Sequence, residues 1–110
     1  MLAHNDLHAR HVLVREGKLS GVIDFGEVSG EPALNEFAKW DFFEDELYPV
    51  RWLKEGYSDQ SVFAPANEPL YRALRLLNGL YILRFYHQIG YARGVAEIRQ
   101  KLERAAQLSA

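Results

Sequence analysis

The sequence predicts an α+β fold that is mainly helical, with one β-hairpin near the N-terminus followed by four helices. Two short apolar runs, residues 12–14 and 19–25, flank the polar stretch 15–18, which contains a glycine and is typical of a tight hairpin. From residue 35 onward the apolar residues recur at helical spacing instead. A chain of 110 residues that is 48% hydrophobic and has a net charge of −2 has the composition of one globular domain.

Two acidic residues stand at the open end of this hairpin. Asp6 precedes the first strand and Asp24 follows the second. Because a hairpin folds its ends together, the sequence predicts that the two carboxylates lie close in space. Such a pair suits metal-assisted phosphoryl transfer, in which one carboxylate accepts the proton of the acceptor hydroxyl and the other holds Mg²⁺ on the nucleotide phosphates.

The residues around these acids match two motifs of kinases. Protein kinases carry H-x-D-L-x-x-x-N in the catalytic loop and D-F-G after the hairpin that follows it. Here His4, Asp6 and Leu7 match the first motif, and residues 24–26 match the second. The spacing of the first motif places His11 where the metal-binding asparagine would stand.

The segment after Asp24 indicates a small-molecule kinase instead of a protein kinase. Gly30-Glu31-Pro32 follows too soon to leave room for a phosphorylatable loop, and Asn5 replaces the arginine that would pair with its phosphate. The chain closely resembles the aminoglycoside phosphotransferase and choline-kinase-like family, whose members typically read H-G-D-L-H-x-x-N-x-L, I-D-W/F-x and G-D-P-x-x-D-L-A at these places. This resemblance extends to about Ala38 and implies the C-terminal lobe of a protein-kinase-like fold, in which the hairpin carries the catalytic loop.

The resemblance also implies roles for individual residues. Asp6 would be the catalytic base, and Asp24 would be a ligand of the Mg²⁺ that accompanies ATP. His11 replaces the metal-binding asparagine. Because Mg²⁺ prefers oxygen ligands, an imidazole is a poor substitute unless the ion is softer, such as Mn²⁺, or unless one ion is absent. His4 and His8 are expected to have structural roles in the catalytic loop.

The segment after the hairpin is strongly acidic, with seven acids and one lysine between residues 27 and 46. In this family the acceptor pocket lies on the helical lobe and is often acidic. The resemblance therefore makes five of these acids candidate contacts for a cationic acceptor. They are Glu27, Glu31, Asp41, Glu44 and Asp45. The alternative is an ordinary solvated cluster near the end of a helix.

Four helices are predicted in the remaining chain. They cover residues 36–43, 50–57, 67–90 and 95–108. Asn35 is expected to cap the first helix and Gly56 to end the second. The third helix carries apolar residues on nearly every side, so we expect it to be buried on most sides.

Other functions remain open at this level. If residues 4–11 formed a helix, His4, His8 and His11 would share one face suited to Zn²⁺, although the adjoining Val-Leu-Val run favours the hairpin. A non-catalytic kinase-like lobe that acts as a binding or assembly module is a further alternative. Residues 71–104 hold seven bases and two acids, but these bases alternate with an apolar face, so no nucleic-acid partner is expected.

Two parts of a complete kinase cannot be placed in these 110 residues. They are the Gly-rich loop that covers the phosphates and the strand lysine that pairs with them. We therefore expect the chain to be the C-terminal lobe of a larger phosphotransferase, with ATP and a small hydroxyl-bearing acceptor as partners. By itself it is expected to be inactive and to self-associate.

The composition limits the compartment and the kinds of site. The chain has no cysteine, which excludes disulfides and thiolate metal sites within it. It shows no signal peptide and no apolar stretch long enough to span a bilayer. A cytoplasmic location without a membrane partner is therefore the default expectation.

Overall fold

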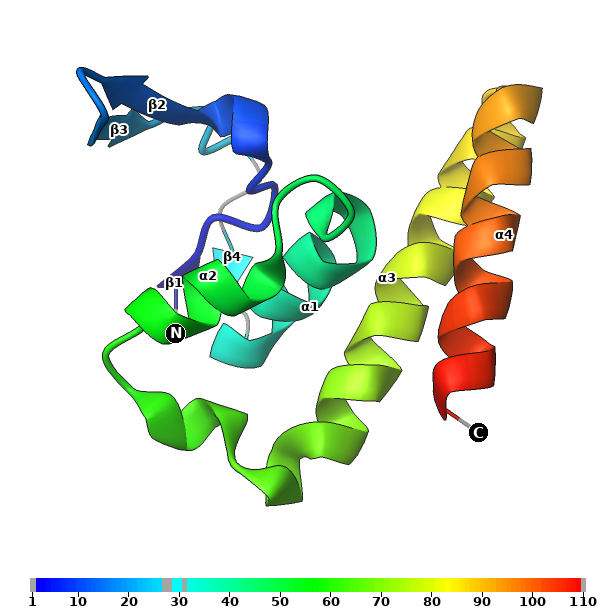
Figure 1. Ribbon diagram of the computed structural model, residues 1–110. Coiled ribbons are helices and arrows are strands. Elements are labelled where there is room, and N and C mark those ends of the chain that lie inside the picture. The colour runs from blue at the N-terminus through cyan, green and yellow to red at the C-terminus, as the bar shows by residue number, and fades with distance from the viewer. Residues whose placement is uncertain (1, 27–28, 31, 110) are drawn as a thin grey trace.

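The computed structural model describes residues 2–26, 29–30 and 32–109 as a helical body from which a β-hairpin projects (Figure 1). The strands are β1 (Leu2–Ala3), β2 (Val12–Arg15), β3 (Lys18–Val22) and β4 (Ser29–Gly30). The α-helices are α1 (Ala33–Glu44), α2 (Val50–Gly56), α3 (Glu68–Gln88) and α4 (Ala92–Ser109). Short 3₁₀ turns occur at η1 (Ala9–His11), η2 (Gln60–Phe63) and η3 (Pro65–Asn67). The predicted fold class, mainly helical α+β, is confirmed.

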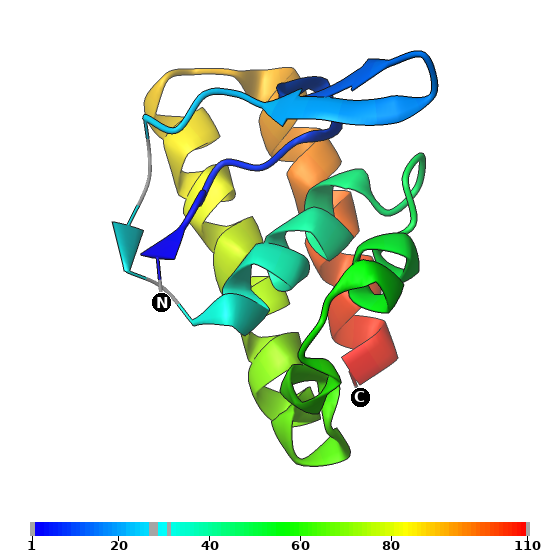
Figure 2. The same ribbon diagram turned by 90° about the vertical axis from the view of Figure 1, so that its left-hand side faces the viewer.

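The predicted hairpin is formed by the antiparallel strands β2 and β3. Its two turn residues, Glu16 and Gly17, both have positive φ angles, of 52° and 76°, which is the backbone that matches the twist of a two-residue hairpin. A register irregularity lies between Leu13 and Val14. Figure 2 shows the hairpin extending beyond the helices, and Val14 and Leu19 on it are exposed.

A second pair of strands ties the N-terminus to the segment before α1. Leu2 pairs with Gly30 and Ala3 with Ser29 in an antiparallel arrangement, and the Ala3 side chain is buried. Strands of two residues are too short to show an alternating pattern, so they were not predicted. Their pairing brings the chain back to α1 after it has left the hairpin.

The core lies between α1, α2 and α3. Leu34, Phe37, Ala38 and Trp40 line the inner side of α1, and they are clustered with residues of the other two helices. These partners are Val50 and Tyr71. The indole Nε1 of Trp40 donates a hydrogen bond to the Tyr48 carbonyl oxygen at 2.7 Å, so the buried ring has no unsatisfied donor.

α3 and α4 run side by side behind α1 (Figure 2). They approach closely at Gly79, where an added Cβ would lie 2.5 Å from a Leu102 side-chain carbon and 2.6 Å from the Phe42 ring. Ile98 and Ala105 are buried on α4. None of the described helices is both long and apolar enough to cross a membrane.

The prediction that Asn35 caps the first helix is wrong. α1 already begins at Ala33, and Pro32 occupies the N-cap position. Asn35 is buried, and its Oδ1 accepts a hydrogen bond of 2.9 Å from the Asn78 side chain on α3. A buried amide needs such a partner, so Asn35 is used between helices instead of at a helix end.

The prediction that the third helix is buried on most sides is also wrong. α3 is covered by α1 and α4, whereas Leu70, Leu77, Leu80 and Tyr81 are exposed. Two neighbouring helices cannot cover every side of a third, because each contact occupies only part of its circumference. An apolar stripe therefore remains on the outer face of α3.

Candidate active site

The loop before the hairpin is fixed to α1 through Asn5. This residue has a φ of 67°, in the left-handed region that asparagine tolerates better than most residues. Its N–H donates a hydrogen bond to Glu36 Oε1. Lys39 Nζ donates to the carbonyl oxygen of Asn5 at 2.8 Å and to its Oδ1 at 2.5 Å. These contacts from one helix determine where the next residue, Asp6, is placed.

His4 connects the same loop to the exit of the hairpin. Its Nε2 lies 2.7 Å from the carbonyl oxygen of Ile23, and its Nδ1 lies 3.2 Å from the N–H of Asp6. A carbonyl can only accept and a backbone N–H can only donate, so Nε2 carries the ring proton. The His4 ring also contacts the Phe25 ring, with 4.5 Å between their centroids. His4 thus ties the backbone of Asp6 to Ile23, the residue before Asp24.

His8 bridges two carboxylates. Its Nε2 lies 2.8 Å from Asp6 Oδ1, and its Nδ1 lies 3.4 Å from Glu44 Oε1 at the end of α1. The side chains of His8 and Glu44 are largely buried, with 25% and 19% exposed. The bridge holds one oxygen of Asp6 toward the helical body.

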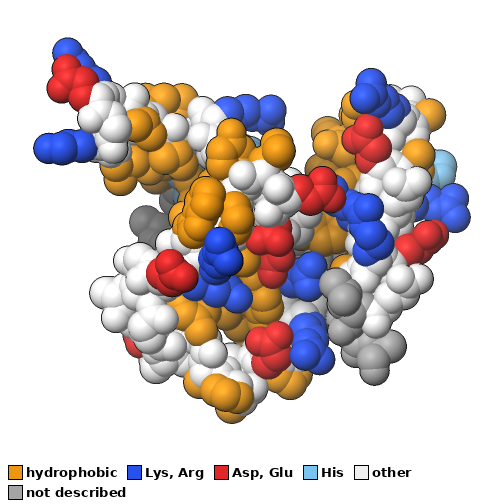
Figure 3. Space-filling model, in the orientation of Figure 1, with side chains coloured by type: hydrophobic (Ala, Val, Ile, Leu, Met, Phe, Trp, Pro, Cys, Tyr) orange, Lys and Arg blue, Asp and Glu red, His pale blue; other side chains and the backbone are white. Residues whose placement is uncertain are grey.

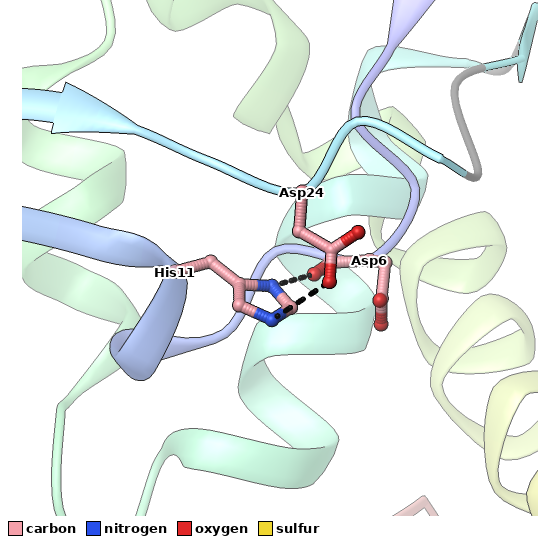
Figure 4. A group of neighbouring side chains, drawn as sticks. All are labelled: Asp6, His11 and Asp24. Carbon is pink, nitrogen blue, oxygen red and sulfur yellow. Dashed lines mark hydrogen bonds and ion pairs between the residues drawn. The ribbon is translucent and has the colours of Figure 1, made fainter.

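The two ends of the hairpin meet as the sequence predicted. Figure 4 shows Asp24 extending from the end of β3 toward the His11 ring. His11 Nδ1 lies 2.8 Å from the backbone carbonyl of Asp6, and its Nε2 lies 3.4 Å from Asp24 Oδ2. Asp6, His11 and Asp24 each offer one ligand atom, and these atoms all lie within 4.8 Å of one another.

Backbone strain occurs at the same place. Besides Asn5, Asp24 also has a left-handed φ, of 65°. Such conformations cost free energy in residues other than glycine and are concentrated at active sites and ligand clamps. Asp24 therefore adopts such a conformation itself, and Asp6 directly follows Asn5, which also adopts one.

The three residues supply a donor set suited to a divalent cation. Two of the donors are carboxylate oxygens, which suit Mg²⁺ and Mn²⁺, and the third is an imidazole nitrogen, which suits first-row transition ions. His11 is the ligand least suited to Mg²⁺. The alternative of a helix with three histidines on one face is not observed, because residues 4–8 are loop and only residues 9–11 make a 3₁₀ turn.

Asp41 and Asp45, two of the five acids predicted to contact an acceptor, are bonded within the helical body. Asp41 Oδ2 accepts a hydrogen bond of 2.5 Å from the Tyr71 hydroxyl and lies 3.3 Å from Arg75 Nε. Burial, together with the hydrogen bond to Asp41 and its charge, raises the pKa of Tyr71 far above that of an ordinary tyrosine. Asp45 Oδ1 accepts a hydrogen bond of 2.9 Å from the N–H of Val50, where α2 begins.

The other three acids differ in position. Glu44 contacts His8 and lines a groove, as described next. Glu27 and Glu31 lie outside the described residues.

A groove of about 500 Å³ opens beside His8, between the catalytic loop and the ends of α1, α3 and α4. Figure 3 shows the surface hollowed between the hairpin side of the molecule and the α3–α4 side. Three tyrosines and charges of both signs line the groove. Its lining residues are His8, Ala9, Arg10, Phe43, Glu44, Tyr48, Tyr86, Tyr91, Glu97, Ile98 and Lys101. His8, which lines the groove, also contacts Asp6, so the groove lies next to Asp6.

The first part of the chain matches a known protein family. Residues 1–46 match the model of the phosphotransferase enzyme family. The family resemblance inferred from the motifs is confirmed over this segment, which contains Asp6, His11, Asp24 and nearly all of the loop contacts described above. Neither the curated proteins nor the solved structures gave a match to the chain. Helices α2 to α4, and with them most of the groove, lie outside the matched segment.

Sequence reasoning missed the residues that act through distant contacts. Glu36 and Lys39 lie one helical turn apart on α1, a spacing that places both on one face, but only the fold shows that this face meets Asn5. Tyr86 and Tyr91 flank the break between α3 and α4. Two tyrosines this close to a predicted helix break could have indicated that the break lines a groove.

Proposed function

We propose that this chain forms the catalytic-loop lobe of a small-molecule kinase, which transfers the γ-phosphoryl group of ATP to a hydroxyl group. The observation that carries the proposal is the convergence of Asp6, His11 and Asp24 within 4.8 Å, inside the segment that matches a phosphotransferase family. Two carboxylates at such a site can divide the work of base and metal ligand.

Asp6 acts as the base in this proposal. The acceptor hydroxyl oxygen attacks the γ-phosphorus, the bond from that phosphorus to the oxygen of the ADP leaving group breaks, and the hydroxyl proton passes to the Asp6 carboxylate. The contacts of Asn5 with α1 fix the backbone before Asp6, and His8 holds one of its oxygens. The other oxygen is left to face the acceptor.

Asp24 and His11 would hold the divalent cation that accompanies ATP. The cation supplies charge neutralisation for the phosphate oxygens. Asp24 has 58% of its side chain exposed, whereas only 12% of the His11 side chain is exposed. Asp24 is therefore the ligand that is open toward a nucleotide, and His11 supports it from inside.

The groove beside His8 suits an acceptor that carries an amine and an apolar face. Three tyrosine rings, those of Tyr48, Tyr86 and Tyr91, offer flat apolar surfaces that also attract cations. Glu44 adds a carboxylate within the groove and contacts the same His8 ring that bonds Asp6. An acceptor bound here would place a hydroxyl near Asp6.

The proposal is tested in a form of the protein that includes a nucleotide-binding lobe. ATP consumption and the formation of a new phosphate ester are followed by ³¹P NMR with a panel of amino alcohols and aminocyclitols. We expect esters to form with at least one acceptor and to be lost in Asp6→Asn, whereas Glu103→Gln, which removes an exposed carboxylate from α4, keeps them. Binding of ATP without transfer to any acceptor would favour the alternative, a non-catalytic lobe used for binding.

We also propose that the isolated chain self-associates through the outer face of α3, most simply as a two-fold dimer. Leu70, Leu77, Leu80 and Tyr81 are all exposed on this helix, and exposed apolar surface of this kind is expected to mark an interface. Sedimentation velocity should show a dimer that Leu77→Glu dissociates. Leu47→Glu, a change at an exposed loop residue, should not do so. A wild-type chain that stays monomeric at micromolar concentrations would contradict the proposal.

A further inference from the structure

We propose that the site formed by Asp6, His11 and Asp24 selects divalent first-row transition ions, such as Mn²⁺, Co²⁺ and Zn²⁺, over Mg²⁺, with His11 Nε2 as a ligand. This inference deepens the proposed function, because the role of the ion in phosphoryl transfer rests on that function. It concerns the ion that the chain itself prefers.

The hydrogen bond of His11 to the loop determines which ring nitrogen faces the site. Nδ1 lies 2.8 Å from the backbone carbonyl oxygen of Asp6. Because a carbonyl oxygen only accepts, Nδ1 must carry a proton. In the neutral ring the lone pair is then on Nε2. A histidine that donates one ring N–H to a carbonyl and presents the other nitrogen is in the arrangement typical of metal ligands.

The group that faces this nitrogen is an acceptor as well. Nε2 of His11 lies 3.4 Å from Asp24 Oδ2 (Figure 4). A ring nitrogen lone pair and a carboxylate oxygen attract each other only when a positive charge lies between them, either a second ring proton or a cation. A carboxylate oxygen of Asp6 lies within 4.8 Å of the ligand atoms of His11 and Asp24, so it adds negative charge beside the ion and keeps its proposed role as base.

The His11 ring is held in this orientation from several sides. Only 12% of its side chain is exposed. The rings of His8 and His4 lie 5.1 and 6.0 Å away between centroids. The Asp6 carbonyl that accepts from His11 belongs to the loop that α1 holds through Asn5. An imidazole fixed in this way presents Nε2 to any ion that enters the site.

The fixed imidazole decides the ion preference. Mg²⁺ requires hard oxygen donors and gives up water reluctantly, so a nitrogen ligand adds little to its binding. Mn²⁺, Co²⁺ and Zn²⁺ gain progressively more from an imidazole while still accepting carboxylates, and their affinities for one site generally rise along the first-row series. An asparagine at position 11 would instead offer an oxygen that suits Mg²⁺.

The test uses the 110-residue chain alone and does not require turnover. Zn²⁺ and Mg²⁺ are titrated separately, and long-range ¹H–¹⁵N NMR follows the ring nitrogens of His4, His8, His11 and His87. We expect Zn²⁺ to shift Nε2 of His11, with Nδ1 keeping its proton, and Mg²⁺ to leave that nitrogen unchanged. Zinc that shifts only His4 or His8, or that binds nowhere, would overturn the inference.

Calorimetry on variants gives a second measurement. His11→Asn should weaken Co²⁺ binding by about tenfold or more and should leave Mg²⁺ binding unchanged or stronger than in the wild type, because the amide oxygen suits Mg²⁺. His87→Asn, a change at an exposed histidine at the end of α3, is the matched control and should change neither. Equal ion preference in the wild type and in His11→Asn would overturn the inference. If His11→Asn does not fold, the ring-nitrogen shifts of the wild type decide.

Failure of this inference can be distinguished from failure of the proposed function. If ion preference is independent of His11 but Asp6→Asn still abolishes phosphate-ester formation, the kinase function stands and only the selectivity is wrong. If His11 binds zinc but no acceptor is ever phosphorylated, the metal site stands and the kinase function is wrong.

Discussion

The catalytic loop with its hairpin and the α3–α4 pair are built by different means. The loop is held by specific polar contacts over long sequence separations, such as those from α1 to Asn5 and from His4 to Ile23. The α3–α4 pair is held by close apolar packing around Gly79 and leaves an apolar face uncovered. The difference indicates that replacing a polar residue in the first region should mainly change activity. A change of side-chain volume in the second region should mainly change the free energy of unfolding.

The largest expected effect comes from removing the proposed base. In a form of the protein with a nucleotide-binding lobe, Asp6→Asn should lower kcat by at least about a hundredfold, because the acceptor proton loses its acceptor. Nucleotide affinity should change little, since the proposed base does not have to hold the phosphates. Steady-state kinetics together with calorimetry measure both quantities. Near-normal turnover in Asp6→Asn would remove Asp6 from the role of base.

The second effect tests the packing of the helical region. In Gly79→Ala the new Cβ would overlap Leu102 and Phe42, so this overlap should lower the free energy of unfolding by about 1–3 kcal/mol. Alanine also favours the helix by about 1 kcal/mol, so the net fall should be up to about 2 kcal/mol. Urea unfolding measures the difference.

The matched control for Gly79 is the glycine that ends α2. A Cβ on Gly56 would have no neighbour within 4 Å. Gly56→Ala should therefore be neutral or stabilise the protein by up to about 1 kcal/mol. Equal stability changes in the two variants would contradict the close approach of the helices at Gly79.

The smallest effect concerns pH and joins the two regions through α1. Burial and Asp41 raise the pKa of Tyr71 in the folded chain above the value of about 10 of an unfolded tyrosine. The resulting stabilisation is fully present below that pH and is lost as the pH rises above it, by up to about 1.4 kcal/mol per pH unit. Unfolding free energies at pH of about 8 and about 11 should therefore differ less in Tyr71→Phe than in the wild type.

Tyr81→Phe is the control for this pH dependence, because Tyr81 is 77% exposed. It should keep the loss of stability that the wild type shows at high pH. If Tyr71→Phe lost as much stability as the wild type between the two pH values, the buried contact between Tyr71 and Asp41 would be wrong.

The sequence predicted the features that depend on neighbouring residues. A glycine within the polar turn and the apolar runs beside it were sufficient for the hairpin, and because a hairpin joins its own ends, the approach of Asp6 and Asp24 followed. The four α-helices of the described residues were predicted from their periodicity, with shifts of a few residues at their ends.

What the sequence did not predict depends on which elements meet. Asn35 is a residue type that often caps helices, but its partner Asn78 lies on another helix. Glu36 and Lys39 are residue types usually found on exposed helix faces, yet they hold the catalytic loop through Asn5. The exposed face of α3 likewise follows from the number of helices around it, which no local pattern contains.

The central claim is that the two ends of the hairpin form one site for phosphoryl transfer. It is tested most directly by kcat/KM for Asp6→Asn, Asp24→Ala and the double variant, in a form of the protein that includes a nucleotide-binding lobe. Residues that act as one unit have strongly non-additive effects. Each single variant should be severely impaired, and the double variant should be about as slow as the slower single one. Two losses that simply multiply, or a single variant with near-normal activity, would contradict it.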